Sequence, residues 1–490
     1  MNANSKNHNN LQIFFFIFLP VFVLTSPLLS QEKFRNTPPY PDPLAELNLP
    51  AIESYTLSNG LSLSVIYQDN IPTISLKLVI LTGESASPEE LPGLATLTAN
   101  MLSRGASTLS SSEIEERIES IGGNFRTSIN PDYSVFTFTF LEEHLDEALD
   151  ILSKMILQPT FTRVEIANVK RSMFYNTLRK TSDPEFIAKR HLYRLLFKNH
   201  PYGKSTYNED VIKNLNQKSL LDFFDKYYRP NNAILVLTGN LNLSTAARKV
   251  SSYLNTWERK NLDTSFIPPP EPYTEKKICF IDLPKAKDAT IYIGNVILAP
   301  SSPDFFPFLV LNQVLGGTPN SRLFMNLRES KEYAYLVFSE VEFFKSCGIF
   351  LIRAKVRPDV IRESVEECFK VIENITKRRV PSNELEQAKS YLIGNFPLKI
   401  ETMEELSSKV SEIKAFDLGE NHWSKYYENI MFTNSKKVFE TAQGYPLLTS
   451  VVVIVGDKNV IIDHVMEFDE IDMYDIKGNL LQSFKKGVIE

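Results

Sequence analysis

The feature that most limits how this chain can fold is an internal repeat. Two pairs of apolar stretches recur at an offset of 217 residues, 79–83 with 296–300 and 233–239 with 450–456. Between its two stretches, each half carries a predicted strand pair, a long amphipathic helix and a further helix. The length of the chain alone suggests about three domains. The repeat instead indicates two homologous domains.

Hydrophobic periodicity predicts the elements of each half. Leu61, Leu63 and Val65 alternate with polar residues after an Asn-Gly turn signal, and residues 134–140 alternate aromatic with β-branched residues, as half-buried strands do. Apolar residues follow the spacing of one helix face at 145–156 and again at 361–375. Strands and long helices are mixed without strict alternation. We therefore expect an α+β fold in which each domain is an antiparallel-rich sheet covered by helices on one side.

A proline-rich join separates the two predicted domains. It carries four prolines between positions 268 and 272 together with several charges, so it is expected to be extended and solvent-facing. We predict a first domain at 52–258, a linker at 259–275 and a second domain at 276–486. A second proline-rich stretch, 31–51, is predicted to form a mobile arm ahead of the first domain.

Residues 1–30 are predicted to be a secretory signal peptide. Met1–Asn10 is polar, Leu11–Leu29 is apolar, and cleavage is expected near Ser30. The alternative is an uncleaved membrane anchor, because the apolar run is long enough to span a bilayer. Pro20 and Pro27 interrupt that run, however, and no basic flank follows it. We expect export to the periplasm, with membrane association only if the leader is retained.

Charge and cysteine usage exclude some classes of function. The net charge is −6 and the sequence has no clustered Lys/Arg stripe, so nothing in it indicates a nucleic-acid-binding surface. The three cysteines, Cys279, Cys347 and Cys368, do not have the spacing of a metal site. In an exported protein they could form one disulfide, whose pairing the spacing does not assign, or they could be three small buried hydrophobes.

The most specific motif is Gly93-Leu-Ala-Thr-Leu-Thr-Ala-Asn-Met-Leu-Ser-Arg-Gly105. It resembles the active-site helix of the M16 (pitrilysin- or insulinase-type, processing-peptidase-like) zinc metallopeptidases, which reads Gly-Leu-Ala-His-x-x-Glu-His-Met-Leu. Thr96 stands at the first zinc-binding His, Ala99 at the Glu and Asn100 at the second His, while the flanking residues match. The resemblance implies the M16/LuxS-like metallohydrolase fold in a member that lacks the zinc motif.

The three replacements remove the chemistry of that motif. Two His at i and i+4 share one helix face and can bind zinc, and the Glu between them acts as general base for the metal-bound water. In the family a third ligand, a Glu, lies about 76 residues downstream. Its counterpart here is Asn176, with a possible shift of one position, and no Glu occurs from residue 172 to 184. We therefore expect no metal in this chain.

A second motif lies in the second half. The phrase Ser321-Arg-Leu-Phe-Met-Asn-Leu-Arg-Glu329, followed by Ala334-Tyr335, is similar to a signature of the second M16 domain in which an Arg and a Tyr are seven residues apart. The resemblance implies a substrate-binding role for Arg328 and Tyr335. The signature departs at Glu332 and Tyr333, where Gly and Leu are common.

The chemistry of this pair is suited to peptide binding. A phenol can donate to the oxygen on which negative charge develops, and a guanidinium can fix a nearby carbonyl or carboxylate. The alternative is structural: Arg328 pairs with Glu329 or Glu332 at a helix end, and Tyr335 simply packs.

The resemblance leads to one main expectation of function. In M16 subfamilies that divide the work, one chain brings zinc and the other brings the Arg/Tyr pair. We expect a catalytically silent subunit that pairs with a zinc-bearing M16 homologue and contributes Arg328 and Tyr335 to proteolysis of unfolded or short peptides. The alternatives are a structural scaffold and a homodimeric peptide-binding protein without turnover.

Overall fold

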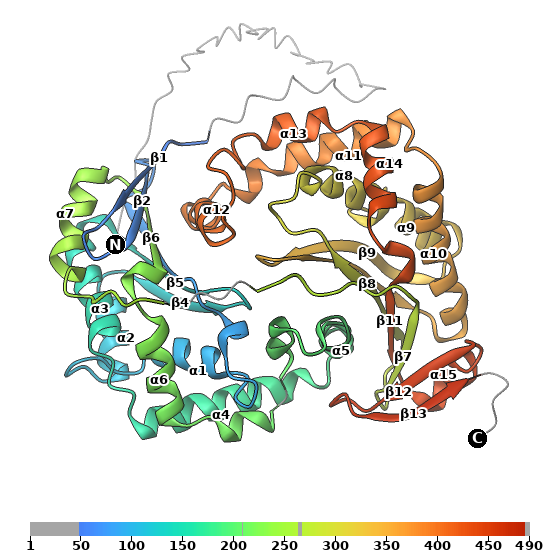
Figure 1. Cartoon of the computed structure of the whole chain (residues 1–490), viewed down its shortest axis with the longest axis horizontal. Helices are drawn as coiled ribbons and strands as arrows, with labels where there is room; N and C mark the ends of the chain where they lie inside the picture. Colours follow the sequence, from blue (N-terminus) through green and yellow to red (C-terminus); the bar gives the residue numbers. More distant parts are fainter. Residues whose placement is uncertain (1–48, 208, 263–266, 486–490) are drawn as a thin grey trace, which may run out of the picture. The chain divides into compact units, whose positions relative to one another are not determined.

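The computed structural model describes residues 49–207, 209–262 and 267–485, which belong to one compact unit. They form two β-sheets with helices, one sheet on each side of the predicted linker (Figure 1). The predicted signal peptide, most of the predicted arm and four residues of the predicted linker lie outside the described residues. Within the described part of the chain, no helix combines the length and the apolar character needed to span a bilayer.

The first sheet has the strand order β1-β2-β6-β3-β5-β4 and the second the order β13-β12-β7-β11-β8-β10-β9. The strands of the first sheet are β1 (Ile52–Thr56), β2 (Ser62–Tyr67), β3 (Thr73–Ile80), β4 (Asn124–Ile129), β5 (Ser134–Leu141) and β6 (Ala233–Gly239). Those of the second are β7 (Lys277–Asp282), β8 (Ala289–Ile297), β9 (Ala334–Phe343), β10 (Gly348–Val356), β11 (Val451–Gly456), β12 (Glu470–Tyr474) and β13 (Leu480–Lys485).

The helices follow the same division. Those of the first half are α1 (Leu94–Met101), α2 (Ser111–Ser120), α3 (Leu145–Leu157), α4 (Arg163–Lys180), α5 (Pro184–Phe197), α6 (Gln217–Tyr227) and α7 (Leu243–Leu254). Those of the second half are α8 (Phe305–Gly316), α9 (Arg322–Phe324), α10 (Ile361–Lys377), α11 (Ser382–Asn395), α12 (Met403–Ala415), α13 (Tyr426–Phe432), α14 (Ser435–Gly444) and α15 (Lys458–Val465). A π-helical turn, Met325–Ser330, continues α9.

The internal repeat appears as a shared five-strand topology. In the first sheet β2 runs parallel to β6, and β6-β3-β5-β4 continue antiparallel. In the second sheet β7 runs parallel to β11, and β11-β8-β10-β9 continue antiparallel. The strand topology of the two sheets differs at the outer edge, where β1 adds to the first sheet and the β12–β13 hairpin to the second. This arrangement confirms the predicted antiparallel-rich α+β fold.

The predicted periodicities coincide with the core. The apolar face of α3 is buried at Leu145, Leu149, Leu152 and Ile156, and the equivalent face of α10 is buried from Ile361 to Ile375. A buried side chain of this size contributes about 1.5–3 kcal/mol, so these two faces fix each long helix against its own half of the molecule.

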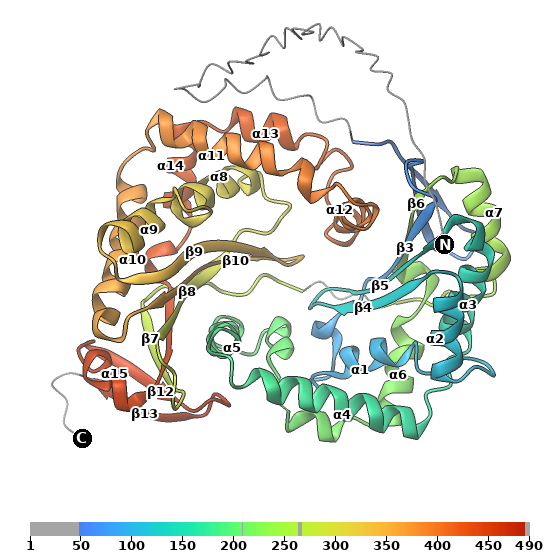
Figure 2. The ribbon, with the colours of Figure 1, turned by 180° about the vertical axis from the view of Figure 1, so that it is seen from behind.

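The second face of each sheet is covered by a helix from the other half, which the sequence did not predict. Helix α5 packs on β8 and β11, and α12 packs on β3 and β6 (Figures 1 and 2). Ile187, Ala188 and Leu192 of α5 are buried against residues of the second sheet such as Val453. Leu406 and Val410 of α12 are buried in the same way against β2, β3 and β6. Each half therefore completes the core of the other, which accounts for a single compact unit.

The turns that join equivalent strands of the two halves also meet. The Tyr202 hydroxyl donates to Asp132 Oδ1 in the β4–β5 turn over 2.7 Å and accepts from the backbone N–H of Ser346 in the β9–β10 turn at 3.2 Å. The Lys345 N–H donates to Asp132 Oδ2 over 2.8 Å. Burial raises the pKa of Asp132. These contacts join the two sheets through polar groups withdrawn from water.

All three cysteines are buried and none forms a disulfide. Burial raises the pKa of Cys279 and Cys368 to about 12. The side chains therefore pack as small hydrophobes, the second of the two alternatives that their spacing left open.

Candidate functional site

Helix α1 carries the degenerate motif. Its N-cap, Gly93, has φ of 93°, a left-handed conformation that glycine adopts without strain. Every residue from Leu94 to Met101 is buried except Thr96 and Asn100. These two are four positions apart and share one helix face, so the positions of the two family His lie on the one side of α1 that is not sealed in the core.

Thr96 is hydrogen-bonded to a buried carboxylate, that of Glu84. The Thr96 hydroxyl donates to Glu84 Oε2 over 2.8 Å and its backbone N–H donates to the same oxygen over 3.1 Å. Glu84 Oε1 accepts from the Ser87 hydroxyl at 2.8 Å and from the Gly93 N–H. Burial raises the pKa of Glu84, and these hydrogen bonds offset part of that rise.

Glu84 therefore caps the N-terminus of α1 from outside the helix. A carboxylate there accepts N–H groups that have no partner within the helix and lies at the positive end of its dipole. Lys204 holds the same segment through the carbonyls of Ser85 and Ser87, at 3.0 and 2.7 Å. The role of Glu84 was not predicted, because no local pattern marks it: its partners lie three to twelve residues downstream.

Asn100 opens onto a polar pocket of about 560 Å³ between α1, α2 and α4. Asn176 lines the same pocket, so α4 brings the predicted counterpart of the third ligand to the same place as the second. Neither Tyr175 nor Thr177 lines it. The remaining lining is largely polar and consists of Arg104, Ser111, Ser112, Glu115, Glu165, Asn168, Val169, Ser172 and Met173.

The residues at the four motif positions do not fit a zinc ion. Ala99 is fully buried and has no polar side-chain atom, and the Thr96 hydroxyl is engaged by Glu84. Amides at positions 100 and 176 supply neither an imidazole nor a carboxylate, which are the nitrogen and oxygen ligands of such centres. In the part of the chain that the structure describes, no group of three His, Cys, Asp or Glu side chains could hold a metal ion.

The second predicted pair lies on the second half. Arg328 belongs to the π-helical turn Met325–Ser330 and Tyr335 is the second residue of the edge strand β9. The Arg328 side chain is 46% exposed, with its Nε 3.8 Å from Glu329 Oε1 and its guanidinium 4.9 Å from the Phe324 ring centroid. Tyr335 is 56% exposed. Among the described residues, no hydrogen bond joins Arg328 to Tyr335.

The loop between them keeps a glycine-like geometry without a glycine. Glu332 has φ of 55°, the left-handed region in which glycine is favoured. The Tyr333 N–H donates to the Leu327 carbonyl at 2.8 Å, and the Tyr333 carbonyl accepts from the Arg357 N–H at 3.1 Å. The backbone therefore adopts a turn that glycine would also support, despite the departure from the signature at these two positions.

Two family models match adjacent parts of the chain. The model described as "Insulinase (Peptidase family M16)" matches residues 64–210, and the model described as "Peptidase M16 inactive domain" matches residues 214–392. Together they include strands β3 to β10, the degenerate motif and the Arg328–Tyr335 segment, whereas β1 and β11 to β13 lie outside the matched residues.

Curated relatives with different descriptions share this similarity. An "Uncharacterized zinc protease YmxG" of Bacillus subtilis is 26% identical over 352 residues, covering 72% of this chain and 85% of the relative. A "Non-peptidase homolog YmxG" of Helicobacter pylori is 26% identical over 359 residues, covering 70% of this chain and 80% of the relative. The family thus includes proteins described as peptidases and one described as a non-peptidase.

Solved structures show the same fold. A peptidase M16 inactive domain from Pseudomonas fluorescens superposes with a TM-score of 0.77 at 21% identity, covering 83% of this chain and 98% of that one. The periplasmic protease PqqL from Escherichia coli superposes with a TM-score of 0.69 at 15% identity, and this chain spans about half of it, 48%. With both domain models matched and the fold shared, the chain belongs to the M16 peptidase family as a member that lacks the zinc motif.

Proposed function

We propose that this protein is a catalytically silent M16 subunit that pairs with a zinc-bearing M16 homologue and binds peptide through Arg328 and Tyr335. The observation that carries the proposal is an asymmetry between the two motifs. At the degenerate motif, Thr96 is bound to Glu84 and Ala99 is sealed in the core. At the second motif, both side chains remain about half exposed to solvent.

The surroundings of Arg328 favour a binding role. Its ion pair with Glu329 is long and exposed, and such surface pairs contribute about 0–1 kcal/mol. A carboxylate or carbonyl of a bound peptide could therefore displace Glu329 at small cost. The residue also lies on a π-helical turn, a rare conformation that occurs frequently at functional sites.

Tyr335 is placed where a peptide could reach it. Strand β9 is the outer strand of its sheet, so among the described residues one side of its backbone has no strand partner, and Tyr335 is close enough to Lys355 and Arg357 to interact with them electrostatically. In the proposed complex the partner supplies the zinc and the general base. Tyr335 donates a hydrogen bond to the oxygen on which charge develops, and Arg328 fixes the peptide.

The substrate class that fits this proposal is short or unfolded polypeptide. The subunit would act in the periplasm after export by its apolar leader, with membrane association only if the leader is retained. The similarity to a periplasmic protease supports export.

The test is reconstitution with a zinc-bearing M16 protein from the same cell. We expect the mixture to cleave an unstructured fluorogenic peptide and this chain alone to be inactive. In the mixture, Arg328→Ala and Tyr335→Phe should each lower kcat/KM at least tenfold. Arg362→Ala is the matched control, because Arg362 is a partly exposed arginine that also pairs with a neighbouring glutamate, Glu366, but lies on α10, where it also donates to the Glu467 carbonyl at 3.2 Å. Peptide cleavage by this chain alone with bound zinc would refute the proposal.

A structural scaffold is the second candidate, because Arg328 already has partners within its own half of the chain. The guanidinium already has a carboxylate and an aromatic ring beside it, so it could serve only to hold its own turn. In that case the two proteins associate, Arg328→Ala leaves cleavage by the complex unchanged, and the variant loses only stability. A homodimer that binds the peptide without turnover would appear in the same experiment as saturable binding by this chain alone.

A further inference from the structure

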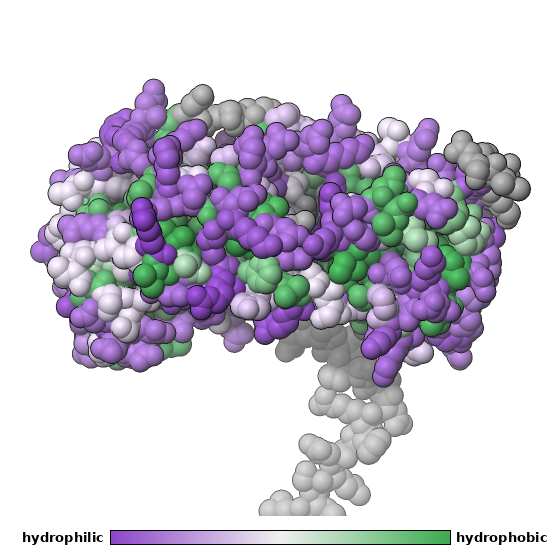
Figure 3. All heavy atoms as spheres, turned by 90° about the horizontal axis from the view of Figure 1, so that it is seen from below, coloured by the Kyte–Doolittle hydropathy of each residue, from purple (hydrophilic) through white to green (hydrophobic). Residues whose placement is uncertain are grey.

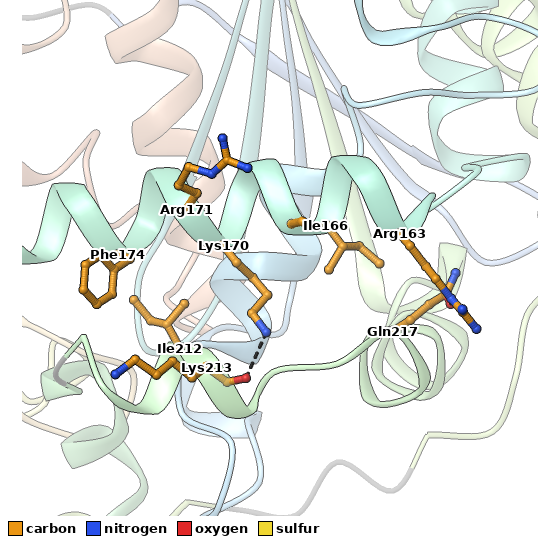
Figure 4. Close-up of a pocket in the computed structure, with 9 residues that line it drawn as sticks. Arg163, Ile166, Lys170, Arg171, Phe174, Ile212, Lys213 and Gln217 are labelled. Carbon is orange, nitrogen blue, oxygen red and sulfur yellow. Dashed lines mark hydrogen bonds between the residues drawn. The ribbon is translucent and has the colours of Figure 1, made fainter.

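A second surface of α4, distinct from the face that lines the polar pocket, forms an open groove of about 510 Å³ (Figure 4). The groove lies between α4 and the segment 212–217, and its floor is apolar. Ile166 and Ile212 are buried beneath it, and Phe174 is partly buried at one end. Arg163 and Gln217 lie at the other end (Figure 4).

The cation in the middle of the groove, Lys170, has neutral hydrogen-bond partners in the described part of the chain. Lys170 Nζ donates to the carbonyls of Lys213 and Leu215, at 3.0 and 2.5 Å. Among the described residues, no carboxylate lies within ion-pair distance of Lys170, and burial lowers its pKa without a compensating acidic neighbour. A partly desolvated ammonium is costly unless an anion accompanies it.

The two ends of the groove add further positive charge. Arg163 Nε donates to Gln217 Oε1 over 3.3 Å, and the described part of the chain places no carboxylate within ion-pair distance of its guanidinium. Lys213 stands 5.9 Å from the Phe174 ring centroid and already pairs with Asp210. Arg171 also lines the groove, and no carboxylate of the described residues lies within ion-pair distance of it. The groove therefore presents three cations without an ion pair over an apolar floor, in a protein whose net charge is −6.

The face that carries the groove is otherwise mixed. Figure 3, which views the molecule from below relative to Figure 1, shows hydrophobic surface in separate patches between hydrophilic side chains. The groove runs along α4 from Arg163 to Phe174, a rise of about 16 Å. An extended peptide of about five residues has that length.

From this charge complementarity and length, we propose that the α4 groove is a docking site for a short acidic peptide segment that also carries apolar side chains. The carboxylates pair with Lys170 and Arg163, and the apolar side chains lie over Ile166 and Phe174. This site is separate from the second-half pair Arg328 and Tyr335, and the inference does not depend on the proposed function.

The test is fluorescence anisotropy of the full chain with a fluorescein-labelled peptide, Asp-Phe-Glu-Leu-Asp. We expect saturable binding that weakens with added salt, because exposed charges are screened. The amide-matched peptide Asn-Phe-Gln-Leu-Asn should bind at least about tenfold more weakly, the effect of losing hydrogen bonds to charged groups.

Variants assign the binding to the groove. Lys170→Met retains the apolar stem and should weaken binding about tenfold, and Arg163→Gln should weaken it about threefold. Lys218→Met is the matched control, because Lys218 is an exposed lysine of α6 that does not line the groove and pairs with Asp222. Arg163 is an exposed residue, so its variant remains informative if Lys170→Met fails to fold.

Three results would overturn the proposal. One is the absence of saturable binding to the acidic peptide. Another is binding that neither variant weakens. The third is binding to vesicles of phosphatidylcholine and phosphatidylglycerol, lost in Arg163→Gln, without binding to the peptide, which would make the groove a membrane-contact site.

Discussion

The replacement of Glu84 by Gln tests whether Thr96 has taken a structural role at the former zinc position. The substitution keeps the size of the side chain and one acceptor oxygen but places an amide N–H₂ where the second carboxylate oxygen lies. Each of the two carboxylate oxygens accepts one backbone N–H of α1, from Gly93 or from Thr96. One of these N–H groups must therefore face a donor in the variant.

The expected loss of stability follows from the one N–H group that no longer has an acceptor. A buried N–H left without an acceptor costs about 1–3 kcal/mol, and loss of the charge weakens the remaining hydrogen bonds. Removal of a buried charge offsets part of this loss, because burial already raises the pKa of Glu84. We expect α1 to lose about 2 kcal/mol of local stability.

Hydrogen–deuterium exchange measures this change where it occurs. A loss of about 2 kcal/mol corresponds to roughly thirtyfold faster exchange, which peptides spanning 93–101 should report, while peptides from the second sheet remain unchanged. Glu89→Gln is the matched control, because Glu89 lies five residues away and is exposed. If Glu84→Gln exchanges at the same rate as the control, Glu84 does not hold the helix and our interpretation of Thr96 is wrong.

The remaining predictions concern the contacts between the halves. Burial lowers the pKa of His191 to about 4 from its usual 6.5, so the unfolded chain takes up the proton first and stability should fall by up to about 3 kcal/mol between pH 7 and pH 4. His191→Gln should flatten that part of a pH series of urea denaturation curves. Tyr202→Phe removes the hydroxyl that donates to Asp132 and should lower the free energy of unfolding by about 2 kcal/mol in the same assay, whereas an unchanged midpoint would contradict the role of the turn contacts. Lys77→Met should change the free energy of unfolding by less than about 1 kcal/mol, because the cost of burying this ammonium outweighs its attraction to the nearby glutamates. The Glu404 carbonyl, which loses Lys77 as a donor, still accepts from the Ser408 hydroxyl. A loss several times larger would show that the ammonium is needed.

Local patterns were sufficient for much of the fold. The repeat at 233–239 and 450–456 predicted two equivalent strands, which are the fully buried β6 and β11. The apolar face at 361–375 predicted a helix, which is α10. Such features are encoded in consecutive residues, because strand and helix periodicities are local properties.

The exchange of α5 and α12 between the halves was not predictable in the same way. An amphipathic helix shows that one of its faces is buried but not which sheet buries it. The buried polar residues of α5 illustrate the difficulty. Arg190 and His191 both approach the carbonyl of Ile476, which lies far along the chain in the loop between β12 and β13.

Some features of the candidate site could likewise be predicted from the sequence, and others could not. The loss of the metal ligands at positions 96, 99 and 100 was evident from the motif alone. The shared pocket of Asn100 and Asn176 required the packing of α1 against α4, and the engagement of Thr96 required Glu84, which a sequence pattern does not mark. The motif and the family resemblance were therefore sufficient to name the positions of the former ligands, including Asn176 on α4, but not the contacts that now surround them.

Metal analysis of the purified chain tests the central claim most directly. The chain is incubated with zinc, dialysed, and its metal content is measured by inductively coupled plasma mass spectrometry, with a zinc-bearing M16 protein treated in parallel. Our account predicts zinc far below one ion per chain, whereas the parallel protein retains its metal. One zinc ion per chain, lost on substitution of Asn100 and Asn176 by Ala, would contradict it.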